Sequence, residues 1–528
     1  MRDGPPGVGV PGHVDMPDDE DPTSISTPEA EETRPEDPAV VSPGSLSESV
    51  GRRAGKNTVV RAVGEVVGKL ASLVLFAALA RAVGQGGVGI FVFGFAYMQI
   101  VTMPVGLGLD RLLIRRVARD RSRLTELMDV LAVKIVVGIP VALLGILAIV
   151  LLGYDPTTIA TVALLAPGLL ADSFARSVFG IFTAHEQSGL LSLSLVVQRV
   201  LAAALGLGAL ALGYGVVAIA VTFTAGTVAG LLMACALAAR RIGLPPVTTS
   251  PQQWRLLTGQ SLPFAVQDIF GVLLAKLDVV ILALLAADAA VGRYGGAYRL
   301  LEATFFLSSS VNGAFAAMYS YLGPTTDPPV GAVAQRSIKL LLFLLVPCAV
   351  SMGVLAGPIT VLFLGEGFRE AAVSVRLLAP AVVLMGLVYL ATSVVVSRGN
   401  PRRLVKLTAG AVALNVTLNF MLIPTLAERG AAAAMVLTEI ALAAVLLRLV
   451  VRSVGRLRWA SMLAGPVLAG IAMGVAMLPL ADTLVPALPL GGSVYLLALV
   501  AIECAIDPSD FRFVARLLRK RLALRPMR

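Results

Sequence analysis

Long runs of apolar residues, separated by short polar stretches, follow one another from residue 57 nearly to the C-terminus. About 20 apolar residues suffice for a helix to cross the hydrocarbon core of a bilayer, so each run predicts a membrane-spanning helix. A β-barrel would instead show short segments of alternating polarity, which the chain lacks. The pattern predicts an all-α polytopic membrane protein with fourteen helices, at residues 58–83, 87–109, 127–151, 158–184, 190–212, 214–238, 256–286, 290–320, 337–364, 371–397, 404–424, 430–452, 460–479 and 486–505.

Composition supports a membrane protein over a soluble one. The 528 residues are 57% hydrophobic and 14% charged, whereas soluble domains carry about 25% charged residues. The net charge is +10, but residues 1–50 hold twelve acidic residues and two arginines, so the rest of the chain carries +20. A basic membrane domain indicates basic cytoplasmic loops, anionic lipid contact or an anionic substrate. Nucleic-acid binding is a poor interpretation, because the basic residues punctuate apolar helices.

The distribution of Lys and Arg predicts the orientation of the helices. The connections between predicted helices 2 and 3, 6 and 7, 10 and 11, and 12 and 13 are basic, and the first of them contains six arginines. The connections on the other side carry few basic residues. Because cytoplasmic loops are enriched in Lys and Arg, the protein is expected to lie in the cytoplasmic membrane with both termini in the cytoplasm.

Composition also divides the chain into parts. The N-terminal stretch is rich in Pro, Asp, Glu and Ser and lacks the apolar core of a signal peptide, which predicts disorder. The connection that contains Pro245 and Pro246 is the candidate hinge between two six-helix halves. The predicted parts are a disordered acidic cytoplasmic tail (1–56), an N-terminal six-helix lobe (57–239), a cytoplasmic connecting loop (240–255), a C-terminal six-helix lobe (256–453), helices 13 and 14 (454–507) and a basic cytoplasmic tail (508–528).

The first predicted helix is unusually polar for a membrane span. Arg61, Glu65 and Lys69 lie four residues apart, so they share one helix face, and Gly64 with Gly68 would let another helix approach closely. A charge at the bilayer centre costs at least about 2.5–3.5 kcal/mol, and one that persists usually faces a wet cavity or a partner. We therefore expect this helix to line a polar cavity. The alternative is a mutually neutralising set near the cytoplasmic rim, with long side chains reaching the interface.

Charged residues recur inside several other predicted helices. A shared cavity would gather the cations around an anionic group such as a diphosphate, through charge-assisted hydrogen bonds. Carboxylates within membrane helices often mark proton or cation relays. For any single residue, a structural ion pair is the alternative. The candidates for substrate binding are Arg61, Lys69, Arg81, Arg176, Arg199, Lys276 and Arg299, and those for ion coupling are Glu65, Asp172, Asp268, Asp278, Glu302 and Glu439.

Motifs for catalysis, metal binding and cofactor binding are missing. The segments 51–56 and 64–69 resemble phosphate-binding loops only loosely, because three rather than four residues separate their glycines and no Ser or Thr follows the Lys. The chain has two histidines, and its three cysteines lie in apolar runs without a metal-binding or disulfide spacing. The first predicted outer connection, residues 84–87, carries no carboxylate for catalysis. We therefore predict no enzyme activity, no metal site and no cofactor.

Several segments in a fixed order resemble a known family. The most specific is LNVTLNFMLIP followed by RGAAAA and a Thr-Glu pair, and ARAVGQGGVGIF, GLGLDRLLIRRVA and KLDVVILALLAADAAVGRYGGAYRLLE agree with it. Over residues 57–505 the chain resembles the oligosaccharide flippases, the polysaccharide-transporter family of the MOP superfamily. The resemblance implies two six-helix lobes around a central cavity, two further helices and alternating access. The acidic N-terminal tail departs from the family's short N-terminus.

The leading functional prediction is a flippase that moves a polyprenyl-diphosphate-linked oligosaccharide across the membrane for cell-surface polysaccharide biosynthesis. Its partners would be the lipid-linked glycan and membrane lipids, with a glycan polymerase or glycosyltransferases as candidate protein partners and no nucleic acid. A lipid II flippase and a multidrug exporter of the same superfamily are alternatives, although an exporter would favour an anionic, aromatic-lined pocket. A membrane glycan polymerase or ligase, and a scaffold acting through the acidic tail, are alternatives of other classes.

Overall fold

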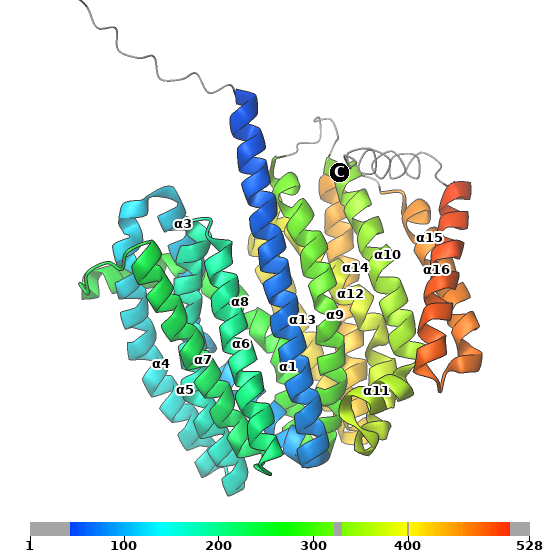
Figure 1. The fold of residues 1–528 in the computed structure, drawn as a ribbon, viewed down its shortest axis with the longest axis horizontal. Coiled ribbons are helices and arrows are strands. Elements are labelled where there is room, and N and C mark those ends of the chain that lie inside the picture. The colour runs from blue at the N-terminus through cyan, green and yellow to red at the C-terminus, as the bar shows by residue number, and fades with distance from the viewer. Residues whose placement is uncertain (1–42, 322–329, 399–400, 456, 507–528) are drawn as a thin grey trace, which may run out of the picture. The chain divides into compact units, whose positions relative to one another are not determined.

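A computed structural model describes residues 43–321, 330–398, 401–455 and 457–506, with side chains from Gly64 onward apart from a few near the chain gaps. The described part is helical throughout, with short 3₁₀ segments and no strands (Figure 1). Contacts between residues divide the protein into two units, Met1–Arg53 and Ala54–Arg528. The predicted acidic tail up to residue 42 and the basic tail from residue 508 lie outside the described residues.

The first helix is longer than a membrane is thick. Helix α1 (Pro43–Val101) has 59 residues, which would extend about 90 Å at 1.5 Å per residue if it were straight. Gly84 breaks it with a φ of 67°, a left-handed conformation that glycine adopts without a steric penalty. The break falls at the predicted turn between the first two membrane helices. Helix α1 starts at Pro43, inside the part of the chain (1–56) that was predicted to be a disordered tail.

The second predicted helix, 87–109, is wrong at its C-terminal end. Helix α1 stops at Val101, α2 (Met103–Gly106) follows, and the left-handed residues Leu107 and Gly108 separate it from α3 (Leu109–Arg119). The arginine-rich segment that was expected to be a loop is therefore mostly helical. Its Leu and Val side chains recur at helical spacing and are buried on one face, whereas its arginines lie on the rest of the surface.

The other predicted spans match observed helices closely, except that 337–364 is split into α10 and α11 and that α8 starts inside the predicted connecting loop. The remaining elements are η1 (Arg121–Thr125), α4 (Glu126–Leu151), α5 (Pro156–Ala184), α6 (Ser188–Ala211), α7 (Val216–Arg241), α8 (Pro251–Leu285), α9 (Asp288–Tyr321), α10 (Val330–Val354), α11 (Ala356–Leu364), η2 (Glu366–Ala371), α12 (Ala372–Ser397), α13 (Pro401–Leu426), α14 (Glu428–Val454), α15 (Trp459–Met477), η3 (Leu478–Leu480) and α16 (Leu484–Ile506).

Local sequence explains where these helices begin. At the start of α5, the side chain of Asp155 accepts a hydrogen bond from the Thr158 backbone N–H at 3.0 Å, and Pro156 occupies the first helical turn. A capping carboxylate and an early proline are both favourable at a helix N-terminus. Burial would raise the pKa of Asp155, but the hydrogen bonds from Thr158 and Thr157 outweigh it and hold the pKa below its usual value.

Eleven segments of the described chain are long and apolar enough to cross a membrane. One of them is Gly64–Val101, which the break at Gly84 divides into two, so these segments account for twelve crossings. Helices α8 and α9 are also long enough, at 35 and 34 residues, but charged side chains interrupt them. Together they give the fourteen crossings that the apolar pattern predicts.

The helices form two lobes. In the first, α5 and α6 both pack against α7. In the second, α12 packs against α9, α10 and α14, and α13 packs against α8 and α14. Helix α1 contacts both, because Gly64 and Gly68 lie against α6, whereas Phe76 and Leu79 share a core with Leu364 of α11. In Figure 1, α4 to α7 accordingly lie on one side of α1 and α10 to α16 on the other.

The last two helices are attached to the second lobe. Helix α15 packs against α16 and against α10. The Lys339 ammonium of α10 forms an ion pair with Glu503 of α16 at 2.5 Å, and both side chains are largely buried. The Tyr495 hydroxyl of α16 also donates a hydrogen bond to the Phe343 carbonyl at 3.0 Å. These contacts fix α15 and α16 to α10.

Candidate functional site

The polar face of α1 lies against α6. A Cβ atom added to Gly64 would lie 3.0 Å from Ser192 Cβ, and one added to Gly68 would lie 2.7 Å from Arg199 Cδ. Glycine therefore lets α6 bring polar side chains up to the α1 backbone. The close approach predicted from the glycine pair is confirmed, with α6 as the partner helix.

Two charges of α1 are paired along the helix. Lys69 Nζ lies 3.2 Å from Glu65 Oε1, which confirms that these residues share a face. The Lys69 ammonium also lies 6.0 Å from the centre of the Phe306 ring in α9, so the same face of α1 reaches the second lobe. Arg61 is in the helix, but its side chain lies outside the described residues.

Arg199 of α6 carries a buried hydrogen-bond donor. Its Nη1 atom has no hydrogen-bond partner within the part of the chain that the structure describes. The guanidinium interacts electrostatically with Glu65, Asp172 and Arg299. It lines a cavity of about 110 Å³ together with Glu65, Leu191, Ser192 and Leu195. A buried donor without a partner is costly, so this group is well suited to bind an anionic ligand.

Helix α5 contributes an ion pair beside Arg199. Arg176 Nη1 lies 2.5 Å from Asp172 Oδ2. The side-chain amide of Gln198, the residue before Arg199, donates to the other oxygen of Asp172 at 3.2 Å. This hydrogen bond joins α5 to α6 and keeps Asp172 next to Arg199.

Helices α8 and α9 contribute two cations on one carboxylate. Glu302 accepts from Lys276 at 3.2 Å and from Arg299 at 3.0 Å. The Arg299 guanidinium lies 5.7 Å from the centre of the Phe76 ring in α1, a cation–π distance. The second lobe therefore presents its charges to the same helix that carries Glu65 and Lys69.

These contacts define what we term the central charged cluster. It draws its side chains from α1, α5, α6, α8 and α9, so both lobes contribute to it. Five cations face three carboxylates, which leaves two positive charges in excess. The cluster consists of Lys69, Arg176, Arg199, Lys276, Arg299, Glu65, Asp172 and Glu302.

Four predicted site residues with described side chains lie outside this cluster: Arg81, Asp268, Asp278 and Glu439. Arg81 is exposed and donates a hydrogen bond to the Leu362 carbonyl of α11, near the Gly84 end of α1. Asp268 forms an ion pair with Arg111 of α3 at 2.6 Å. Arg81 and Asp268 therefore connect helices, and Asp268 also interacts electrostatically with Arg176 of the cluster.

A buried pair of the first lobe was not among the predicted site residues. Lys134 of α4 is fully buried and lies 2.8 Å from Asp110 of α3. Its ammonium also donates to the Ser173 carbonyl of α5 at 2.6 Å, so the pair joins three helices. Asp110 was overlooked because it follows the end of a predicted span, where an acidic residue resembles an ordinary loop charge.

Asp278 and Glu439 form a second polar region, inside the second lobe. Asp278 is 2% exposed and accepts hydrogen bonds from the Tyr294 hydroxyl and, at 2.8 Å, from the Val279 N–H. Glu439 is 7% exposed, and its Oε2 atom has no hydrogen-bond partner among the residues described. Tyr298 interacts electrostatically with both carboxylates. The sequence signal for this region is two tyrosines four residues apart in α9.

Asn415 joins α13 to α14, and Asn419 contacts it from within α13. Asn415 donates to the Thr438 hydroxyl of α14 at 3.4 Å, one residue before Glu439. Asn419 in turn donates to the Asn415 side chain at 2.9 Å.

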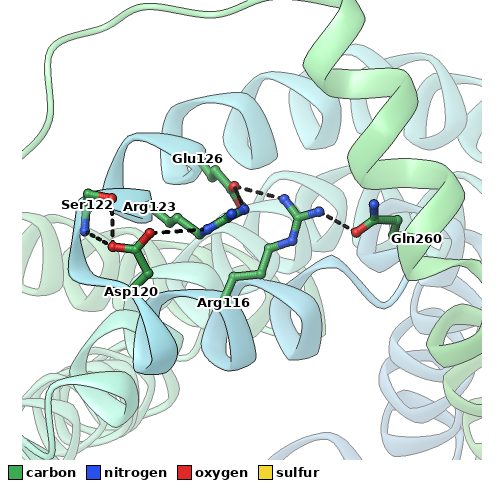
Figure 2. A network of polar contacts seen from close by, with 6 residues as sticks. All are labelled: Arg116, Asp120, Ser122, Arg123, Glu126 and Gln260. Atoms are coloured by element: carbon green, nitrogen blue, oxygen red, sulfur yellow. Dashed lines mark hydrogen bonds and ion pairs between the residues drawn. The ribbon is translucent and has the colours of Figure 1, made fainter. Parts of the chain in front are cut away.

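A third network connects the lobes next to α3. Figure 2 shows Arg116 of α3 between Glu126 of α4 and Gln260 of α8, and it donates hydrogen bonds to both. Arg123 also donates a hydrogen bond to Glu126. The Arg116–Glu126 distance is 2.8 Å. Hydrogen bonds from Ser122 hold the pKa of the exposed Asp120 below its usual value. The sequence had indicated only loop charge here, whereas Arg116 fastens α8 to the first lobe.

At the Gly84 end of α1, the two lobes are in backbone contact. A Cβ atom on Gly89 would lie 2.0 Å from the Asp288 carbonyl oxygen of α9, and one on Gly292 would lie 1.9 Å from that of Gln85. Arg293 adds hydrogen bonds of 2.8 Å to Glu428 and to the Gln85 side chain. This end of the interface, which we term the α1–α9 closure, leaves no room for a substrate between α1 and α9.

Metal binding finds no support in the described residues, among which no three His, Cys, Asp or Glu side chains are grouped to hold an ion. The apolar helices of the described chain, in two lobes that share charges in the interior, define a polytopic membrane protein. Residues 54–321, just over half of the chain, match the family described as polysaccharide biosynthesis protein. The chain therefore belongs to that family, and it is a multi-pass membrane protein.

Solved structures with the same fold are MOP superfamily transporters. A lipid II flippase, MurJ, in an inward closed conformation has a TM-score of 0.68 at 12% identity, covering 84% of this chain and 99% of its own. An inward-facing multidrug resistance MATE transporter has a TM-score of 0.60 at 16% identity, covering 75% and 98%. A MOP transporter from Pyrococcus furiosus, described as having a binding pocket of reverse polarity, has a TM-score of 0.57 at 16% identity, covering 76% and 95%. No curated protein matches the chain significantly.

Proposed function

We propose that the protein is a flippase that moves a polyprenyl-diphosphate-linked oligosaccharide from the inner to the outer leaflet of the cytoplasmic membrane, for cell-surface polysaccharide biosynthesis. The observation that carries the proposal is the central charged cluster, with its excess of two positive charges and its buried, unpartnered Arg199 Nη1. A diphosphate that links a lipid to a sugar carries about two negative charges. The cluster therefore complements the charge of this head group.

The composition of the cluster also suits release. Passage through hydrocarbon would strip water from the diphosphate at a prohibitive cost, and charge-assisted hydrogen bonds from Arg and Lys offset that cost. Lys69, Lys276 and Arg299 are each already paired with a carboxylate, however. Because these carboxylates compete with the diphosphate for the cations, they limit how tightly the cluster binds the substrate. The lipid tail would stay in the bilayer while the polar head passes the cluster.

Alternating access would proceed by opening and closing the α1–α9 closure. With the basic loops placed in the cytoplasm by the positive-inside rule, that closure faces the outside. The described conformation would then be one in which the outer path is shut, and release of the glycan would require α1 and α9 to separate. The polar region around Asp278 and Glu439 is proposed to couple this movement to a proton or cation, with Glu65, Asp172, Asp268 and Glu302 as further candidates.

Flipping in reconstituted vesicles tests the proposal. The purified protein should accelerate the movement of a fluorescent polyprenyl-diphosphate-linked oligosaccharide, and the same lipid with a neutral head group should not move. Reversing two cluster cations, Arg199→Glu with Arg299→Glu, should abolish this movement without loss of insertion. Normal flipping by that double variant would contradict the cationic mechanism.

A lipid II flippase is the second candidate, favoured by the similarity of the fold to MurJ. Lipid II also carries a diphosphate, so the cluster suits both. A competition experiment with lipid II and other diphosphate-linked glycans in the same vesicles separates the two substrates. A multidrug exporter of cationic compounds is disfavoured by the positive excess of the cluster.

A further inference from the structure

A second cavity lies away from the central charged cluster, between the end of α14 and the start of α15. Its volume is about 440 Å³, which falls within the range of small-molecule sites. Its walls combine two guanidinium groups with apolar side chains and one indole ring. The lining residues are Ala444, Leu447, Arg448, Val451, Arg452 and Trp459.

The two arginines of this cavity have no acidic partner. Arg448 and Arg452 are four residues apart on α14 and both are exposed. Neither forms an ion pair with any residue that the structure describes. Like charges at this spacing repel each other, and the C-terminal end of the helix offsets part of that repulsion. A bound anion would offset the remaining repulsion between the two arginines.

The opposite wall is held in place by α10. The Gln335 side chain accepts a hydrogen bond from the Arg458 backbone N–H at 3.4 Å, and Leu457 is buried. These contacts fix the residues just before Trp459, which begins α15 and packs against the core of the second lobe. The indole therefore forms a fixed wall at the end of a membrane span, a depth at which Trp is typically enriched.

We propose that this cavity binds the head group of an anionic phospholipid. The phosphate would lie between the guanidinium groups of Arg448 and Arg452, which suit phosphate oxygens because each presents several N–H donors in one plane. The glycerol and the first acyl carbons would lie along Leu447, Val451 and Trp459. The occupant is a lipid rather than a soluble anion because α14 is a membrane span up to Val454, so the cavity opens at head-group depth.

Quenching of Trp459 fluorescence tests this proposal. The chain has two tryptophans, so Trp254→Phe leaves Trp459 as the only indole. The variant is reconstituted in nanodiscs of phosphatidylcholine that contain a small fraction of brominated phosphatidylglycerol or, in parallel, of brominated phosphatidylcholine. Each arginine near an anionic lipid contributes about a fivefold preference. We expect brominated phosphatidylglycerol to quench Trp459 at least about fivefold more effectively, and Arg448→Gln with Arg452→Gln to remove that preference.

A matched control distinguishes this cavity from general surface charge. Arg240→Gln with Arg241→Gln removes the same charge from two exposed residues at the end of α7, and it should leave the lipid preference intact. Equal quenching by both lipids, or a preference that survives loss of Arg448 and Arg452, would overturn the proposal. If soluble glycerol phosphate displaced the brominated phosphatidylglycerol, the cavity would be a site for phosphate rather than for a lipid, which would also overturn the proposal. The measurement needs no transport, so it stands apart from the proposed flippase activity.

Discussion

Arg199 differs from the other cations of the central charged cluster. Lys69, Arg176, Lys276 and Arg299 each have a carboxylate within 3.2 Å, whereas Arg199 makes no such ion pair with a described residue. The sequence could indicate that these cations belong to membrane helices, because each interrupts an apolar run. It could not rank them, because ranking depends on which carboxylates the neighbouring helices supply.

Replacing Arg199 by Gln should slow flipping about tenfold or more, because hydrogen bonds to charged groups contribute about 1.5–3 kcal/mol. Thermal stability of the purified protein should not fall, because the substitution removes a buried charge that lacks an ion-pair partner. Initial flipping rates and melting temperatures measure the two effects. The control is Arg240→Gln, at an exposed position. A lower melting temperature with unchanged flipping would make Arg199 a structural residue.

Replacing Glu439 by Gln should remove the dependence of flipping on an imposed ion gradient. Glu439 Oε2 is buried without a described hydrogen-bond partner, so the carboxylate can take up a proton or attract a cation by its charge, whereas an amide takes up no proton and offers a cation only a neutral oxygen. Downhill flipping should continue. Rates measured with and without proton and sodium gradients provide the comparison, with Glu366→Gln, a residue exposed next to Arg369, as the control. An unchanged gradient response would place the coupling elsewhere.

At the scale of helices, the apolar runs predicted nearly every span, because length and hydropathy alone decide whether a segment can cross a bilayer. The apolar runs did not predict a helix that is rich in charged residues. The segment of α3 was predicted to be a loop because of its arginines, although Leu109, Leu113 and Val117 recur at helical spacing. The proximity of α1 to α6 and α9 could not be predicted either, because a glycine pair indicates that some helix comes close but not which one.

The α1–α9 closure predicts a difference between two glycines three residues apart. Gly89→Ala should separate α1 from α9, because its Cβ would lie 2.0 Å from the Asp288 carbonyl oxygen, a rigid backbone atom. Gly86→Ala should be tolerated, since nothing lies within 4 Å of that position. We expect a melting temperature at least about 2 °C lower for Gly89→Ala only. Equal melting temperatures for the two variants would contradict the described packing.

At the scale of the whole molecule, the proposed direction of transport depends on the orientation of the chain. In a variant without its three native cysteines, single cysteines at positions 115, 241, 402 and 456 should react with membrane-impermeant reagents only from the cytoplasmic side. Cysteines at 366 and 429 should react only from outside, because the loops around them carry few basic residues. Labelling of whole cells and of inverted vesicles provides the measurement. The opposite pattern would reverse the proposed topology and turn the α1–α9 closure toward the cytoplasm.

The pair of Asp110 and Lys134 has a consequence for how the chain enters the membrane during synthesis. An uncompensated lysine in the middle of a helix costs about 2.5–3.5 kcal/mol to insert, yet Lys134 is fully buried. Its carboxylate lies only 24 residues earlier in the chain, so at about 5–20 residues per second the ribosome has made Asp110 a few seconds before Lys134. Asp110 can therefore neutralise Lys134 as soon as α4 enters the membrane, because α3 and its carboxylate have already been synthesised. Insertion of this region would then need no helix that is synthesised later.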